Sequence, residues 1–256
     1  MQEHPAFRTM KRFQSTAFPR YMRNLVAYAA VTLSLSCVSS NALAESGTTD
    51  VIPCAGTSIE VNTHDPDDRQ MLCDAARQTV RFLQRYDMTR RQLLRVHVLQ
   101  DPDAHKRGKE FGSYNRATGE VKLLSFGAFK AQYGDYQTFR VPASRALYQS
   151  FGVHEIAHAV ADENFRVSPV PWLAQEYIAA VVQFATMDPE LRTRILERYH
   201  LSGFETPASI SSIYYQLDPG AFAIKSYLHY IRLEDPRTFL RDLLSGTLLL
   251  GDDDFW

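Results

Sequence analysis

The chain has 256 residues, a formal net charge of −1 and 45% apolar residues, values that are ordinary for a soluble globular protein. This length allows one large domain or two small ones, with a sizeable hydrophobic core. The basic residues form no stripe with interleaved aromatic residues, so we expect no nucleic-acid partner.

Residues 1–44 have the order of a secretory signal peptide. Residues 1–24 contain five basic residues and one acidic residue, the apolar run LVAYAAVTLSLSCVSS comes next, and small residues follow at Ala42 and Ala44. We expect cleavage after Ala44, which leaves residues 45–256 as a single exported domain, periplasmic or secreted, with a net charge near −5. An uncleaved anchor is the alternative, although this run is short for a membrane span of about 20 residues.

Two cysteines remain after such a cleavage, Cys54 and Cys73. In an oxidising compartment an even pair that flanks one short loop predicts a disulfide. Two separate thiols are the alternative.

The first part of the mature chain predicts a small sheet with one helix. Residues 45–60 are rich in Gly, Ser and Thr and are expected to be a loose lead-in. Asp65 and Pro66 then predict a helix start, and apolar residues at helical spacing continue it to about Tyr86. Residues 93–100 alternate as a strand does, and residues 112–124 predict a hairpin with its turn at 115–119.

After the hairpin the apolar pattern becomes helical. The dipeptides Asp188-Pro189 and Asp218-Pro219 are helix start signals. The predicted helices are 144–164, 171–187, 189–199, 220–233 and 236–245. A small sheet followed by a helical half is an α+β arrangement.

The segment GVHEIAHAVADENF, residues 152–165, contains residues that could bind a metal ion. Two histidines four apart on a helix, His154 and His158, point the same way and can bind one zinc ion at about 2.0–2.1 Å. Glu155 can then sit beside the water at that site. The histidines fall on an apolar face of a helix that is apolar on two sides, which indicates a central position. Two hydrogen-bonded core histidines without a metal are the alternative.

A third ligand has to come from another helix. Asp162 continues the same row but lies about 12 Å along the axis from His154, too far to share an ion. It is a possible partner of His158 or, as we favour, an acidic residue near the helix end. In WLAQEYIAA, Glu176 falls at the margin of the buried stripe while Gln175 lies on the opposite side. A carboxylate that faces a core needs a partner or a metal, although Glu176 could also reach solvent.

HEIAH followed by WLAQEYIAA resembles the gluzincin branch of the zincin metallopeptidases, in which a second helix supplies a glutamate as third ligand. Glu176 and Ala179 match the Glu-x-x-Ala pattern of those enzymes. One extra residue separates Trp172-Leu173 from the glutamate, and 17 residues, one fewer than usual, separate His158 from it. These departures indicate a small secreted peptidase-like family rather than the aminopeptidases. The resemblance implies a zincin-like fold in which the 112–124 hairpin supplies an edge strand for an extended substrate.

The resemblance also implies a function. Zn²⁺ held by His154, His158 and Glu176 would activate a water for hydrolysis of a peptide or protein substrate, with Glu155 as general base. Tyr215 is the implied oxyanion donor, while Tyr214, Tyr227 and His229 remain open. We expect an endopeptidase. The alternatives are a non-catalytic zincin-fold binding module of the cell envelope and a zinc hydrolase that acts on a cell-wall amide. The sequence leaves the oligomeric state open.

Overall fold

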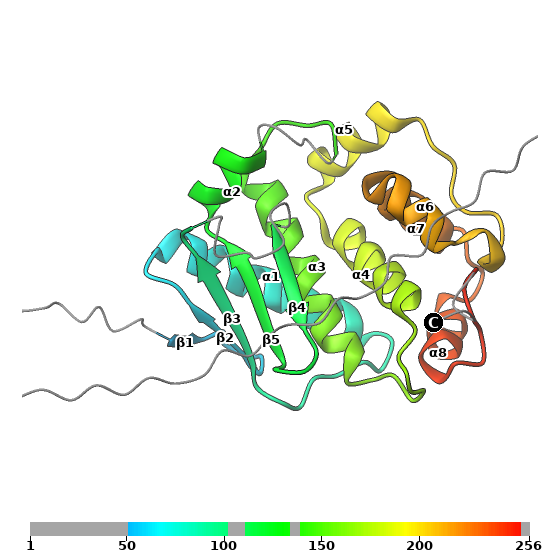
Figure 1. The fold of residues 1–256 in the computed structure, drawn as a ribbon, viewed down its shortest axis with the longest axis horizontal. Coiled ribbons are helices and arrows are strands. Elements are labelled where there is room, and N and C mark those ends of the chain that lie inside the picture. The colour runs from blue at the N-terminus through cyan, green and yellow to red at the C-terminus, as the bar shows by residue number, and fades with distance from the viewer. Residues whose placement is uncertain (1–50, 102–110, 134–138, 252–256) are drawn as a thin grey trace, which may run out of the picture. The chain divides into compact units, whose positions relative to one another are not determined.

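A five-stranded mixed sheet begins the part of the chain that the computed structural model describes, which comprises residues 51–101, 111–133 and 139–251 (Figure 1). The predicted signal segment, residues 1–44, lies outside the described residues. The strands are β1 (Val51–Pro53), β2 (Ile59–Asn62), β3 (Leu94–Leu99), β4 (Gly112–Asn115) and β5 (Glu120–Leu124), in the spatial order β1-β2-β3-β5-β4. β2, β3 and β5 are parallel neighbours. The two edge strands are antiparallel to the strands beside them, β1 to β2 and β4 to β5.

The strands alternate between a buried and a more exposed face, as one-sided sheets do. In β3, Leu94 and Val96 are buried whereas Arg95 is exposed, and in β5, Val121 and Leu123 are buried on either side of exposed Lys122. The register pairs Val96 with Val121. The buried side chains therefore gather on one face of the sheet, where the helices cover it.

The lead-in predicted over residues 45–60 is wrong for its described part, because β1 and β2 form there. Ile59 and Val61 are 1% and 0% exposed, so they belong to the core. Their alternation covers only four residues, Ile59–Asn62, and follows a turn rich in Gly, Ser and Thr, which conceals it in the sequence.

Helix α1 (Pro66–Gln84) begins as predicted at Pro66. The Asp65 side chain accepts hydrogen bonds from the backbone N–H groups of Asp67 and Asp68, at 2.8 and 3.2 Å. The predicted disulfide is confirmed: Cys73 in α1 is bonded to Cys54, which follows β1. The bond links the turn between β1 and β2 to helix α1.

The predicted hairpin is also confirmed, as β4 and β5 with a turn at Asn115–Gly119. The Gly119 N–H donates to Asn115 O at 2.8 Å, and Gly119 has φ +66°, a conformation that favours glycine. β4 pairs only with β5 among the described strands, so it forms one edge of the sheet.

The second half is mainly helical, so the α+β prediction is confirmed. Asp188 and Asp218 cap their helices as the start signals predicted. Two helices, α2 and α6, were not predicted; α6 has only six residues. The helices are α2 (Phe126–Tyr133), α3 (Arg145–Asp162), α4 (Trp172–Thr186), α5 (Pro189–Tyr199), α6 (Ser212–Leu217), α7 (Pro219–Tyr230) and α8 (Pro236–Ser245), with a 3₁₀ turn at Pro207–Ser209.

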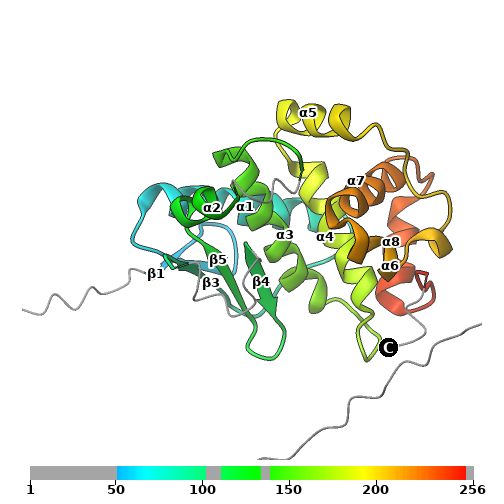
Figure 2. The same ribbon diagram turned by 45° about the horizontal axis from the view of Figure 1, so that its top comes forward.

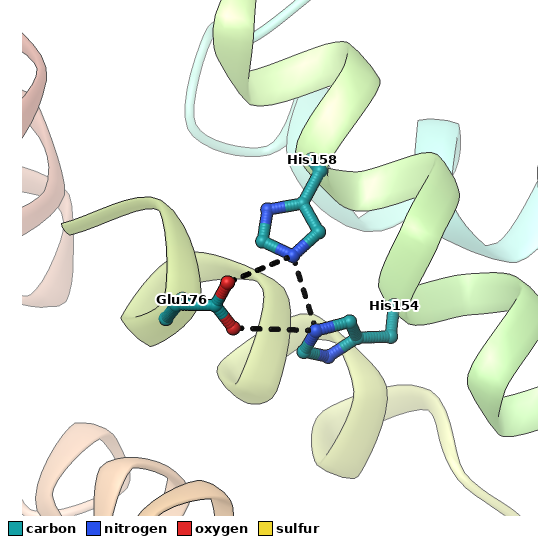
Figure 3. A group of neighbouring side chains, drawn as sticks. All are labelled: His154, His158 and Glu176. Carbon is teal, nitrogen blue, oxygen red and sulfur yellow. Dashed lines mark hydrogen bonds and ion pairs between the residues drawn. The ribbon is translucent and has the colours of Figure 1, made fainter. Parts of the chain in front are cut away.

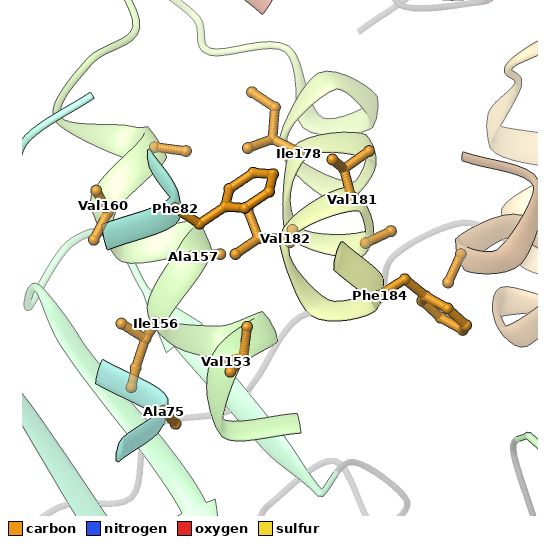
Figure 4. Close-up of a cluster of buried hydrophobic side chains, with 14 of the residues drawn as sticks. Ala75, Phe82, Val153, Ile156, Ala157, Val160, Ile178, Val181, Val182 and Phe184 are labelled. Atoms are coloured by element: carbon orange, nitrogen blue, oxygen red, sulfur yellow. The ribbon is translucent and has the colours of Figure 1, made fainter. Parts of the chain in front are cut away.

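Helix α3 lies in the centre, with the sheet and α1 on one side and α4 on the other (Figures 1 and 2). Gly152 permits the close approach of α3 to α1, because a Cβ atom there would lie 2.7 Å from Leu72 Cδ2. Apolar side chains of three helices then form what we call the α1–α3–α4 cluster (Figure 4). Its members include Ala75, Phe82, Val153, Ile156, Ala157, Val160, Ile178, Val181, Val182 and Phe184.

Among the residues that the structure describes, no helix is both long and apolar enough to cross a membrane.

Candidate metal centre

Helix α3 supplies two imidazoles to one point. The helix begins behind Ser144, whose Oγ accepts from the Leu147 N–H at 3.2 Å. One turn apart on the same face, His154 and His158 bring their Nε2 atoms to 3.1 Å from each other (Figure 3). His158 is 7% exposed, so this point lies inside the protein.

Helix α4 supplies a carboxylate to the same point. Glu176 is 8% exposed, and its Oε2 and Oε1 lie 3.6 Å from the Nε2 atoms of His154 and His158 respectively (Figure 3). One ligand atom from each of the three residues falls within 4.8 Å of the others. The three residues that the sequence singled out as ligands are thus brought together by two neighbouring helices.

The donor set fits a metal ion. Two ligands at about 2.0–2.1 Å from one tetrahedral ion lie about 3.3 Å apart. The two histidine Nε2 atoms are 3.1 Å apart, and each lies 3.6 Å from a different oxygen of Glu176. Glu176 Oε2 is buried without a hydrogen-bond partner within the protein. A buried carboxylate oxygen in that state is expensive unless a cation balances it. His154, His158 and Glu176 could therefore hold a metal ion.

The electrostatics favour the metal-binding protonation states of His158 and Glu176, but not that of His154. Burial lowers the pKa of both histidines; for His158 it prevails over the charge of Glu176, and the pKa falls to about 4. For His154, the contact with Glu176 and the charges of Glu155 and Glu176 outweigh burial and raise the pKa. Burial raises the pKa of Glu176, but the charge of His158 and the contact with His154 outweigh it, so the pKa is lowered. Glu176 is consequently an anion.

A cavity of about 620 Å³ lies over the three groups. Glu155 is on its wall, and β4 passes along one side with Gly112, Ser113 and Tyr114. A Cβ atom at Gly112 would lie 2.7 Å from Glu155 Cγ, so only glycine lets the edge strand pass this close to the carboxylate. Much of the remaining wall is aromatic, with Phe139, Phe151, Trp172, Tyr215 and Phe222.

Tyr215 lies at this cavity, on α6. Its ring packs edge-on against Trp172 and Phe222, with centroids 4.9 and 5.2 Å apart. A hydrogen bond from Tyr215 is one of the weaker causes that lower the Glu176 pKa, after burial and the two histidines are counted. Tyr215 therefore reaches the metal ligands. His229, one of the residues left open, lies elsewhere and bonds Tyr177.

Sequence reasoning misplaced two residues next to the ligands. Gln175 was predicted on the side of α4 opposite the buried stripe, but it is 9% exposed and lines the cavity. Its Nε2 donates to Asp162 Oδ1 at 3.1 Å. Asp162 is therefore more than an acidic residue near a helix end, as we had favoured, because it also accepts from Tyr114 OH at 2.9 Å and pairs with Arg116 at 2.6 Å.

Gln183 was missed altogether. It is 2% exposed, lines the cavity, and bonds Ser150 on α3. Its position seven residues after Glu176 is two helical turns further along the same face, and this spacing was the available signal.

Fold and site together define an α+β protein with a buried His–His–Glu group that could bind a metal ion. The chain belongs to the Family of unknown function (DUF6639), whose model matches residues 59–253 and so includes every residue of the site. No curated protein and no solved structure matches the chain.

Proposed function

We propose that this protein is an exported zinc-dependent metallopeptidase of the gluzincin type, which cleaves peptide bonds within a chain. One observation carries the proposal: two imidazoles and a carboxylate converge at the floor of a cavity whose wall holds Glu155 and an edge strand. The order His154-Glu155-x-x-His158, with Glu176 on the next helix, is the arrangement that the resemblance implies.

His154, His158 and Glu176 are the proposed ligands of the ion. Two imidazoles and one carboxylate are a donor set used by catalytic zinc, which keeps a further position open. When bound, zinc polarises a substrate carbonyl and makes water a better nucleophile.

Glu155 is the proposed general base. It follows His154 directly and faces the cavity beside β4. There it would accept a proton from the attacking water and donate it to the departing amine, which needs one carboxylate within hydrogen-bond reach of both. Tyr215, which lines the same cavity next to Glu176, is the proposed donor to the oxyanion.

The edge strand β4 is the proposed binding site for the substrate backbone. Its outer side has no neighbouring strand among the described residues, and an extended peptide can pair with such an edge. Gly112, Ser113 and Tyr114 would then align the peptide along the cavity past Glu155. The proposed signal segment and the Cys54–Cys73 disulfide both suit a protein that acts outside the cytoplasm.

The test measures metal content and activity in the same preparation. We expect one zinc per chain by mass spectrometry and cleavage of a mixed peptide library by the wild type. Glu155→Gln should retain zinc and lose cleavage, whereas Glu190→Gln, an exposed carboxylate on α5, should behave as the wild type. Glu176→Ala should lose the metal.

Three outcomes would contradict parts of the proposal. A wild type without zinc rejects the metal site, and zinc retained by Glu176→Ala rejects the third ligand. One bound zinc with no cleavage of any peptide rejects the peptidase and favours the binding module, or a hydrolase for a different amide.

A further inference from the structure

A buried glutamine on α4, Gln183, has its amide orientation fixed by Ser150. Gln183 Nε2 donates to Ser150 Oγ at 3.3 Å, and the Ser150 hydroxyl gives its own proton to Leu147 O at 2.7 Å. Ser150 can therefore only accept from Gln183, so the carbonyl end of the amide is left for another neighbour. Ser150 and His154 lie one turn apart on the same face of α3, which places this amide beside the His154 ring.

A second glutamine is oriented in the same way at the other end of the site. Gln175 Nε2 donates to Asp162 Oδ1 at 3.1 Å, and an ionised carboxylate can only accept. Arg116 and Tyr114, both from the hairpin, hold that carboxylate in place. Asp162 is one turn beyond His158, so the carbonyl end of the Gln175 amide is available to the His158 ring.

Both imidazoles need such an acceptor. Their Nε2 atoms converge on the proposed ion, while His154 Nδ1 and His158 Nδ1 are buried and have no hydrogen-bond partner within the protein. A neutral imidazole carries one N–H and one lone pair, so an Nε2 that binds metal requires the proton on Nδ1.

We propose that Gln183 and Gln175 are positioning residues for the metal ligands: a small rotation of each imidazole brings its Nδ1–H to the amide Oε1, which accepts the proton and leaves both Nε2 lone pairs for the ion. This inference rests on the metal site of the proposed function, and it assigns two residues of α4 to that site beyond the ligand Glu176.

Zinc affinity, measured by competition with a chelating dye, is the first test. Gln183→Met and Gln175→Met keep the side-chain length but remove the acceptor, and each should weaken binding about 10–100-fold. Gln149→Met is the matched control, because Gln149 lies next to Ser150 but bonds Gln78 away from the cavity, and it should bind zinc as the wild type does. Unchanged affinity in both variants of the α4 glutamines would overturn the inference.

Rescue separates an acceptor from mere packing. Gln183→Glu still offers an oxygen to His154, so it should keep affinity within a few-fold of the wild type, well above Gln183→Met. If the two variants lose affinity equally, the hydrogen bond is not the cause and the inference fails.

The histidine tautomers give a readout that does not need zinc. Nitrogen NMR of the metal-free protein at alkaline pH should show the Nδ1–H form of His154 in the wild type and a mixture of tautomers in Gln183→Met. The same tautomers in both proteins would contradict the inference. A wild type that binds no zinc would reject the proposed function, and this measurement would still decide the role of Gln183.

Discussion

The two faces of helix α3 contrast sharply. One face puts Val153, Ile156 and Val160 into the α1–α3–α4 cluster, where shape and volume are the only requirements. The other presents a polar row one turn apart: Ser150, His154, His158 and Asp162. Both are largely buried, yet only the apolar face gains free energy from its burial.

The contrast indicates that the apolar face of α3 contributes mainly to stability, whereas its polar face contributes to the candidate site. Each polar side chain in the row depends on a specific atom of a neighbouring element: Gln183 donates to Ser150, and Gln175 donates to Asp162. Changes on the apolar face should therefore reduce the free energy of unfolding, while changes in the polar row should mainly reduce metal affinity.

The largest loss of stability should come from Phe82→Ala, at the α1 side of the cluster. Phe82 is 4% exposed, so the free energy of unfolding in urea should fall by about 3–5 kcal/mol. Phe82→Leu should lose clearly less. Zinc affinity of the folded variant should match that of the wild type, and a parallel loss of affinity would break the division between the two faces.

Removal of the disulfide should have the next largest effect. Cys54 and Cys73 are 19 residues apart, and opening a loop of this size reduces the free energy of unfolding by about 3 kcal/mol. We expect Cys54→Ala/Cys73→Ala to unfold at lower urea, with a midpoint that reductant no longer changes. A midpoint equal to that of the oxidised wild type would contradict the expectation.

Addition of zinc should test the contribution of the polar face of α3 to stability. Zinc at a free concentration 100 times its Kd should raise the free energy of unfolding by about 2.7 kcal/mol, because only the folded state binds it. Phe82→Ala should show the same increase, and Glu176→Gln little or none. If Glu176→Gln gains as much as the wild type, zinc is bound elsewhere.

The N-terminus of α3 is common to both faces, and its cap should have a smaller effect. Ser144→Ala removes the acceptor for the Leu147 N–H and should reduce the free energy of unfolding by about 1 kcal/mol. Ser144→Asp should retain the cap and most of the stability. Equal losses in the two variants would show that the capping oxygen contributes nothing.

The smallest effect concerns His229, a buried histidine outside the polar row. Burial lowers its pKa, with help from the charge of Arg232, and Nδ1 is 2.8 Å from Tyr177 OH. Below about pH 6.5 His229 is protonated in the unfolded chain, whereas in the folded protein it remains neutral to a lower pH. The free energy of unfolding therefore falls as the pH decreases through that value. His229→Asn keeps an acceptor for Tyr177 and should show a shallower decrease in urea midpoint. Identical pH profiles would rule out this contribution.

The sequence predicted most of the site because it depends on regular spacing. Four-residue spacing placed His154 and His158 on one face, and a carboxylate at the margin of an apolar stripe indicated Glu176. The same stripe argument was wrong for Gln175, because it assumes that a helix has an exposed side. Residues 173–184 of α4 are all buried, so its polar positions cannot be sorted by periodicity. Their partners on α3 decide which way they point, and those contacts are tertiary.

In the sheet, β3 and the β4–β5 hairpin were predicted, whereas β1 and β2 were not. The hairpin was visible because its turn and its returning strand each have a distinct pattern. β1 and β2 have three and four residues, too few for alternation to stand out. β1 pairs with β2, and β2 in turn pairs with β3, which is distant in the sequence.

The glycine at position 112 has a consequence for the mobility of the proposed base. With the backbone of β4 against its Cγ, Glu155 has few rotamers available in the folded protein, and this restriction exists before any substrate arrives. The loss of side-chain entropy therefore falls on folding rather than on the reaction. A larger residue at position 112 would have to displace Glu155. A correctly folded protein could then keep the proposed metal site while the Glu155 carboxylate samples orientations that do not reach the cavity.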